Sequence, residues 1–194
     1  MSSREYILQQ IKKNKPELAP LPSLPSFERN DVDLLTHFKE TLKFVGGMAI
    51  ELRDDQNINK EISKIYHDAK QIVSNTDFVS LANFDLTFVT DPHDLKDIDL
   101  AILKGEFGVA ENAAVWIPAN TLAHRALPFI TQHVVFILEK YKLVWNMHEA
   151  YKKINLQNTD GYGVFISGPS KTADIEQSLV IGAHGSRSLT VFLI

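Results

Sequence analysis

The polar residues best suited to chemistry gather near the C-terminus. An apolar run, Gly163 to Ile166, is followed by a stretch rich in hydroxyl, ammonium and carboxyl groups: Ser167, Gly168, Ser170, Lys171, Thr172, Asp174 and Glu176. The run predicts a short strand, Gly168-Pro169 predicts a tight loop, and the Ser, Thr and Asp residues are good helix N-caps. Free N–H groups at a helix start attract anions. The sequence therefore predicts a strand, a loop and a helix that together bind a small anion.

A second polar group follows this predicted helix. Gly182 and Gly185 lie on either side of His184 and end the helix, Arg187 comes next, and Leu189 to Ile194 predicts another strand. Strand, helix and strand within about thirty residues form a βαβ unit with parallel strands. Ligands of open α/β sheets bind beyond the carboxyl ends of the strands. We therefore expect His184, Gly185 and Arg187 to lie beside the anion site.

Two glutamates are candidates for catalysis. Glu106 and Glu111 lie in the insert Gly105 to Asn112, between two predicted strands. Paired acids can act as general acid and base or as a nucleophile. The simpler interpretation of the C-terminal stretch stays open, because a Gly-, Pro- and Ser-containing loop also serves as a plain connection, with Asp174 as a cap and Glu176 in the first helical turn. A Walker loop is excluded, because Ser170 precedes Lys171 where that motif has glycine.

Composition limits the chemistry further. The chain has no cysteine, which excludes disulfides and cysteine-ligated iron–sulfur clusters within it. No two of its seven histidines have the helical or HxH spacing of a metal pair, so we expect no metal site. The net charge of −4 argues against a nucleic-acid partner. The start has no apolar signal core and no apolar run suits a membrane span, so we expect a cytoplasmic protein.

The chain divides into two parts. Residues 1–30 predict a helix, Ser3 to Lys13, and a stiff arm with four prolines between Pro16 and Pro25. This helix could pack on a partner or on a second copy of the chain. Residues 31–194 alternate helical patterns (31–45, 59–69, 147–154) with strand patterns (48–52, 71–74, 97–103, 113–117, 134–138), which predicts one α/β domain.

Two segments carry a family resemblance. Ile166 to Glu176, with Gly182 to Leu189, closely resembles the closing signature of the LUD domain, the lactate utilisation protein C family, and Gly105 to Glu111 resembles its second motif. Asn112-Ala113 departs from the Thr-Gly that many relatives have there. The resemblance implies a three-layer α/β/α fold with a mainly parallel sheet, like that of CoA transferases and ribose phosphate isomerases. It also implies a binding cleft at the C-terminal signature, with Glu106 and Glu111 facing it.

Three functions remain open at this point. The resemblance implies a subunit of an L-lactate-oxidising system that binds a small anion, holds no cofactor itself and works with separate iron–sulfur subunits. The fold likeness alone also allows a stand-alone enzyme acting on acyl-CoA or a phosphosugar, with Glu111 as nucleophile or base. The proline-rich arm suits a third function, a scaffold without chemistry.

Overall fold

A five-stranded parallel sheet forms the centre of the molecule. The computed structural model describes residues 2–20, 22–23, 25, 27, 29, 31–173, 179–182 and 184–194. The sheet has the order β1-β11-β6-β3-β2. Its strands are β1 (Met48–Glu51), β2 (Ile72–Ser74), β3 (Leu100–Lys104), β6 (His133–Leu138) and β11 (Ser188–Leu193). The three inner strands are buried apolar runs, as expected for a parallel sheet covered on both faces.

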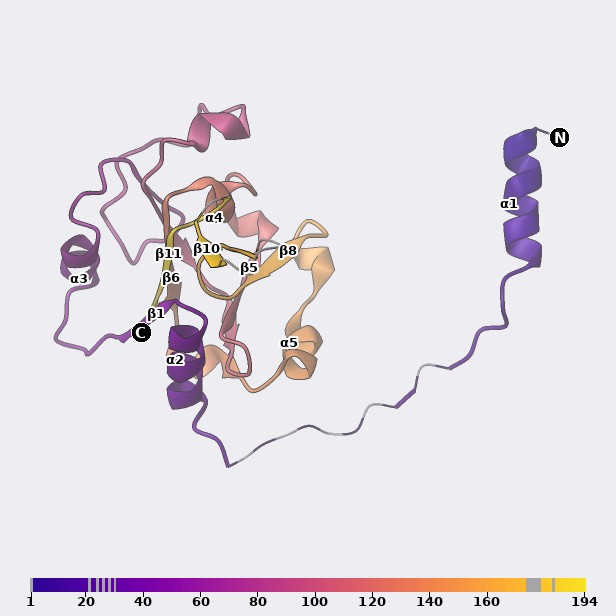
Figure 1. Ribbon diagram of the computed structural model, residues 1–194, viewed down its shortest axis with the longest axis horizontal. Coiled ribbons are helices and arrows are strands. Elements are labelled where there is room, and N and C mark those ends of the chain that lie inside the picture. Colours follow the sequence, from indigo (N-terminus) through magenta and orange to yellow (C-terminus); the bar gives the residue numbers. More distant parts are fainter. Residues whose placement is uncertain are drawn as a thin grey trace.

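Helices cover both faces of this sheet (Figure 1). On one face α2 (Leu34–Phe44) buries Phe38 and Leu42, and on the other α3 (Ile58–Ile65) buries Ile62. The side chain of Asp33 caps α2, which begins three residues after the start of the helical pattern 31–45, and Asn57 caps α3. The α/β class with a mainly parallel sheet is thus confirmed.

A second, smaller sheet lies on the α2 face. Its strand order is β7-β4-β5-β8, with β4 (Phe107–Val109), β5 (Ala114–Pro118), β7 (Leu143–Val144) and β8 (Gly163–Ile166). Helix α5 (Met147–Lys153) begins where the helical pattern 147–154 predicts, is capped by Asn146, and packs on the outer side of this sheet around Phe107 and Trp116. The insert between the predicted strands is therefore not only a polar loop, because it contains the buried strand β4.

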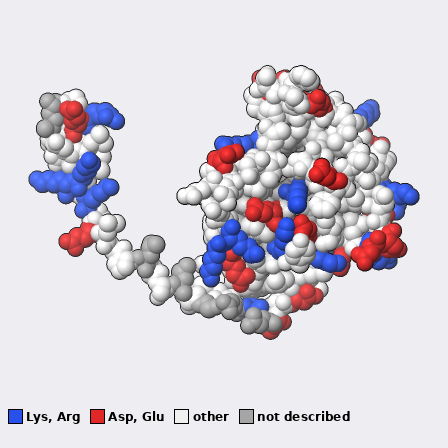
Figure 2. Space-filling model, turned by 180° about the vertical axis from the view of Figure 1, so that it is seen from behind, with Lys and Arg blue, Asp and Glu red and all other residues white. Residues whose placement is uncertain are grey.

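Short helices connect these layers. They are α4 (Leu127–Ile130) and the 3-10 turns η1 (Pro92–Leu95), η2 (Ala119–Thr121), η3 (Lys140–Lys142) and η4 (Leu156–Asn158). Figure 2 shows the molecule from behind, with basic and acidic side chains interspersed on that side of the α/β body.

The predicted helix after the C-terminal loop is wrong. Residues on both sides of 174–178 form an antiparallel pair instead, β9 (Lys171–Ala173) with β10 (Leu179–Ile181). The predicted βαβ unit is also wrong, because β8 pairs antiparallel with β5 in the small sheet whereas β11 belongs to the central one. Asp174 and Glu176 lie outside the described residues.

The N-terminal helix stands apart from the α/β body (Figure 1). Helix α1 (Ser3–Lys13) forms as predicted, with a capping box in which Ser2 and Glu5 bond to each other's backbone N–H groups. None of its residues is buried. Its stability thus comes from local interactions alone.

Candidate functional site

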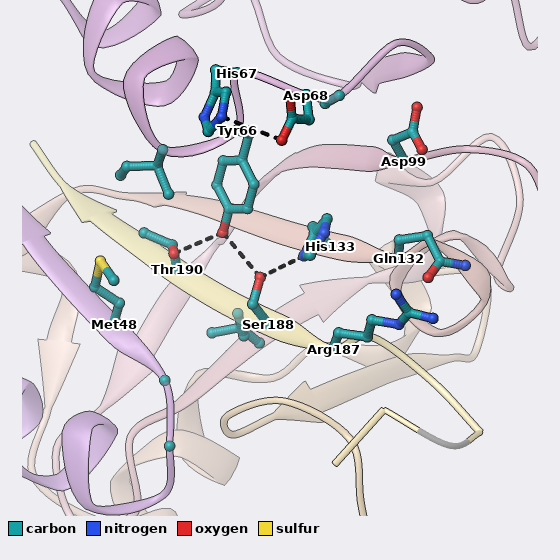
Figure 3. Close-up of a pocket in the computed structure, with 15 residues that line it drawn as sticks. Met48, Tyr66, His67, Asp68, Asp99, Gln132, His133, Arg187, Ser188 and Thr190 are labelled. Atoms are coloured by element: carbon teal, nitrogen blue, oxygen red, sulfur yellow. Dashed lines mark hydrogen bonds and ion pairs between the residues drawn. The ribbon is translucent and has the colours of Figure 1, made fainter.

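A pocket of about 470 Å³ opens at the amino-terminal edge of the central sheet. Its polar wall consists of residues at or near the starts of the neighbouring strands β11, β6 and β3, with the end of α3 above them (Figure 3). The polar and charged side chains that line it include Tyr66, Asp99, Gln132, His133, Arg187, Ser188 and Thr190. This is the opposite edge of the central sheet from the carboxyl ends of its strands, beyond which the sequence predicts the ligand.

Strand register explains why the polar residues meet. Ser188 and His133 are Cα partners in the parallel pair β11 and β6. Side chains two apart on a strand share a face, so Thr190 lies on the same face as Ser188. Further along that face Phe192 and Val135 are buried with α3. The polar wall is thus the amino-terminal end of an otherwise apolar surface, where α3 ends and Tyr66 reaches in.

Four of these side chains are joined by hydrogen bonds (Figure 3). The Tyr66 hydroxyl lies 2.8 Å from Thr190 Oγ1 and 3.3 Å from Ser188 Oγ. Ser188 Oγ lies 2.8 Å from His133 Nδ1. Thr190 is only 1% exposed, whereas the other three are half-buried. The chain of bonds therefore runs from the core to the pocket and fixes the orientation of the imidazole ring.

Two titratable groups in the pocket have shifted pKa values. Burial, followed by the nearby positive charge of Arg187, lowers the pKa of His133, and Asp99 offsets part of this effect. The pKa of Asp99 is itself lowered, chiefly because its Oδ2 accepts the backbone N–H of Gln71 at 2.9 Å, and also that of Lys70 at 2.8 Å. At neutral pH the pocket thus holds an uncharged imidazole beside a guanidinium.

The C-terminal signature reaches the rim of this pocket through Arg187, Ser188 and Leu189. The N–H of Ser170 donates to the carbonyl of Ser186, and the N–H of Gly182 donates to the carbonyl of Ser170, both at 2.9 Å. These bonds join the two halves of the signature. A Cβ on Gly46, a pocket residue, would lie 3.9 Å from Lys171 Nζ. Lys171 and Arg187 are thereby brought to one rim, and neither forms an ion pair with any described residue.

Other predicted binding residues have structural contacts. Ser167 Oγ donates to the carbonyl of Asn112 at 2.6 Å. Gly168 has φ +74°, and a Cβ there would come within 2.7 Å of the Val45 carbonyl. Thr172 pairs with Val180. The last two predicted binding residues, His184 and Gly185, lie between β10 and β11. A Cβ on Gly185 would lie 2.8 Å from Ser170 Cβ, whereas His184 is exposed.

The two glutamates do not form a pair. Glu111 follows β4, and its Oε2 accepts the N–H of Met147 at the start of α5, 3.1 Å away. Glu106 precedes β4 and lines a different pocket, with Lys104 and Lys142. The prediction that both face one cleft is therefore not met, and Glu111 has a structural role as a helix-start acceptor.

Within the described ranges, no three His, Asp or Glu side chains cluster as a metal site. Nor does any helix among those residues have the length and apolar character needed to cross a bilayer.

Comparison with known proteins decides the family. The model of the LUD domain matches residues 90–194, which include β3, the small sheet, the signature rim and β11. The chain belongs to the LUD domain family. The LUD match thus includes His133, Arg187, Ser188 and Thr190, whereas Tyr66 lies before it.

Named relatives extend the match beyond the LUD segment. The chain is 26% identical to lactate utilization protein C of Geobacillus sp. (strain WCH70), over 99% of this chain and 79% of that protein. It is 30% identical to lactate utilization protein C of Bacillus velezensis over 66% of this chain, but only 48% of that protein. A crystal structure of a DUF162 family protein from Deinococcus radiodurans has the same fold, with a TM-score of 0.63 at 13% identity, over 82% of this chain and 95% of that one.

Proposed function

We propose that this LUD domain protein takes part in lactate utilisation, as a subunit of a system that oxidises L-lactate to pyruvate. The observation that carries the proposal is the similarity to lactate utilization protein C over nearly the whole chain. The absence of cysteine suits a subunit that leaves cysteine-ligated iron–sulfur clusters to partner chains. The proposal places the protein in the cytoplasm.

The proposed ligand is a small carboxylate held between the signature loop and the amino edge of the central sheet. Arg187 offers a guanidinium, the group best suited to bind a carboxylate with two parallel hydrogen bonds. Lys171 adds a second cation at the rim. The pocket also presents Gln132 and the Ser188 hydroxyl, which suit the hydroxyl or keto oxygen of a two- or three-carbon acid.

A thermal-shift titration of the full chain with L-lactate and pyruvate tests the ligand. A ligand that binds only the folded state raises the melting temperature with its concentration. We expect this rise in the wild type and its loss in Arg187→Gln. Arg53→Gln is the matched control, because Arg53 is an exposed arginine remote from this rim, beside Asp55. Stabilisation by CoA instead of either acid would favour the stand-alone enzyme.

The proposed partners are iron–sulfur subunits, and α1 is their proposed contact. Its side chains Tyr6, Ile7 and Ile11 are each more than half exposed. Anaerobic co-purification with the iron–sulfur proteins of the same organism tests this part. Full-length protein should retain them, and a chain lacking residues 1–26 should not. Retention of a second copy of the chain instead would assign the arm to self-association.

A further inference from the structure

One nitrogen of His133 has a hydrogen-bond partner among the described residues, and the other has none among them. Nδ1 meets Ser188 Oγ at 2.8 Å, whereas no described residue forms a hydrogen bond with Nε2. Asp99, an acid of the same pocket, accepts two backbone N–H groups and forms no hydrogen bond with the ring. Because His133 lines the pocket (Figure 3), its free nitrogen is available to a bound molecule.

The charges around this ring are few and come from three directions. Arg187 lies before β11 and Asp99 before β3, and the rim beyond Tyr66 carries His67 paired with Asp68 at 3.2 Å. Asp99 attracts a proton to the ring and Arg187 repels one. Removal or neutralisation of the Arg187 charge therefore favours the imidazolium.

A carboxylate ligand bound to Arg187 would neutralise the guanidinium charge in this way. It offsets the guanidinium charge and adds a negative charge inside a partly buried pocket, where charges interact more strongly than in water. The hydroxyl chain tolerates either state of the ring, because Ser188, Tyr66 and Thr190 can each donate or accept. With an imidazolium, Nδ1 donates to Ser188, Ser188 to Tyr66 and Tyr66 to Thr190.

We propose that a carboxylate ligand bound at Arg187 loads a proton onto His133, and that the imidazolium then donates from Nε2 to the ligand. The proton comes from solvent and no bond of the ligand changes. Tyr66 and Thr190 are positioning residues that hold Ser188 against Nδ1. This inference rests on the proposed function, because it takes a carboxylate in this pocket as given.

Proton uptake on binding can be measured directly. Pyruvate and L-lactate are titrated calorimetrically into the full chain at pH 7, in PIPES and in imidazole buffer, whose heats of ionisation differ. We expect net uptake of a fraction of a proton, and an affinity that increases as the pH falls, by at most about tenfold per unit. His133→Gln should bind more weakly without uptake. His93→Gln, an exposed histidine beside Asp91, should retain the uptake.

The outcomes separate the two proposals. Binding with equal observed heats in the two buffers means that no proton is taken up, which overturns this inference and leaves the proposed function standing. Absence of binding by both acids overturns the proposed function. A ligand-free measurement checks the coupling itself: in Arg187→Gln the NMR titration of His133 should move to higher pH than in the wild type. An unchanged titration would overturn the inference whatever the ligand does.

Discussion

At the scale of single residues, the Tyr66 hydroxyl is the junction of the pocket wall. It meets Thr190 from the core side and Ser188 from the pocket side. Tyr66→Phe keeps the ring but leaves the buried Thr190 hydroxyl without this partner. Such a group costs about 1–3 kcal/mol when unsatisfied, so we expect a loss of that size in the free energy of unfolding by urea.

The control for this change is Tyr151→Phe. Tyr151 is 65% exposed and contacts Phe165 through its ring, which the substitution keeps. Its effect should stay within about 0.5 kcal/mol. Equal effects of the two substitutions would mean that the Tyr66 bonds contribute nothing to stability.

Asp99 links the stability of the same region to pH. Its carboxylate accepts the N–H groups of Lys70 and Gln71, and its pKa lies below the ordinary 3.8. A lowered pKa in the folded protein means that the unfolded chain binds the proton more tightly than the folded protein does. The contribution of the Asp99 carboxylate to the free energy of unfolding is therefore present above about pH 3.8 and is lost as the pH falls through the lowered pKa.

Asp99→Asn should remove this dependence. We expect the loss in the free energy of unfolding between pH 7 and pH 2.5 to be smaller in the variant than in the wild type, measured by urea titration at each pH. Asp94→Asn removes one exposed acid and corrects for the change in net charge. An identical loss in wild type and Asp99→Asn would contradict the assignment.

The sequence identified part of the site and missed the rest for a physical reason. Arg187 and Lys171 stood out because they follow Gly- and Ser-rich turns. His133 and Ser188 did not, although each comes immediately before an apolar run. They are 55 residues apart, and only the pairing of β11 with β6 makes them neighbours. A polar residue at the first position of a buried strand was the available signal.

At the scale of elements, β8 lies against β5 with no room for a larger residue. A Cβ on Gly163 would come within 2.2 Å of the Trp116 ring. Overpacking of this kind costs about 1–3 kcal/mol or more, so Gly163→Ala should lower the free energy of unfolding by about 3 kcal/mol or more. Gly161→Ala is the comparison, because nothing lies within 4 Å of its Cβ and only its φ of +69° is unfavourable.

The ordering of these two variants is the test. Chemical denaturation should find Gly163→Ala the less stable one, since a left-handed alanine costs about 1 kcal/mol. The opposite order would mean that Trp116 moves aside without loss.

Helices that carry their own start signals could be predicted closely. Helices α5 and α1 begin at the predicted residues, and Asn146 and Ser2 cap them. The helix wrongly predicted after β8 also came from residues that favour helix starts. Ser170 and Thr172 are good caps, yet Thr172 is a β-branched residue that pairs with Val180 in an antiparallel ladder. Local propensity does not distinguish the two outcomes, because the partner strand decides.

At the scale of the whole molecule, the α/β class could be predicted but the sheet order could not. The strand nearest the C-terminus, β11, lies between β1 and β6, and the small sheet takes up strands that the sequence alone assigns to the main one. Alternating helical and strand patterns indicate a layered fold. They do not say which strands share a sheet, because that depends on contacts between distant segments.

The arm and the body should behave as separate units. Helix α1 has no buried residue. The arm contacts the body at Phe27, whose ring stacks on His148 at 4.7 Å and whose carbonyl accepts from Asn146, and at Arg29, which lies over the Trp145 ring. A chain lacking residues 1–26 keeps these contacts. Its free energy of unfolding should therefore stay within about 0.5 kcal/mol of the full chain.

A further substitution locates the boundary. In the shortened chain, Phe27→Ala removes the ring that covers His148 and should lower the melting temperature, whereas Leu18→Ala in the full chain should not, because Leu18 is fully exposed. Calorimetric scans of the four proteins would show this pattern. If removal of residues 1–26 itself lowers the melting temperature at every protein concentration, α1 stabilises its own body. If the melting temperature of the full chain rises with protein concentration and that of the shortened chain does not, α1 instead holds two copies together, since self-association stabilises by mass action.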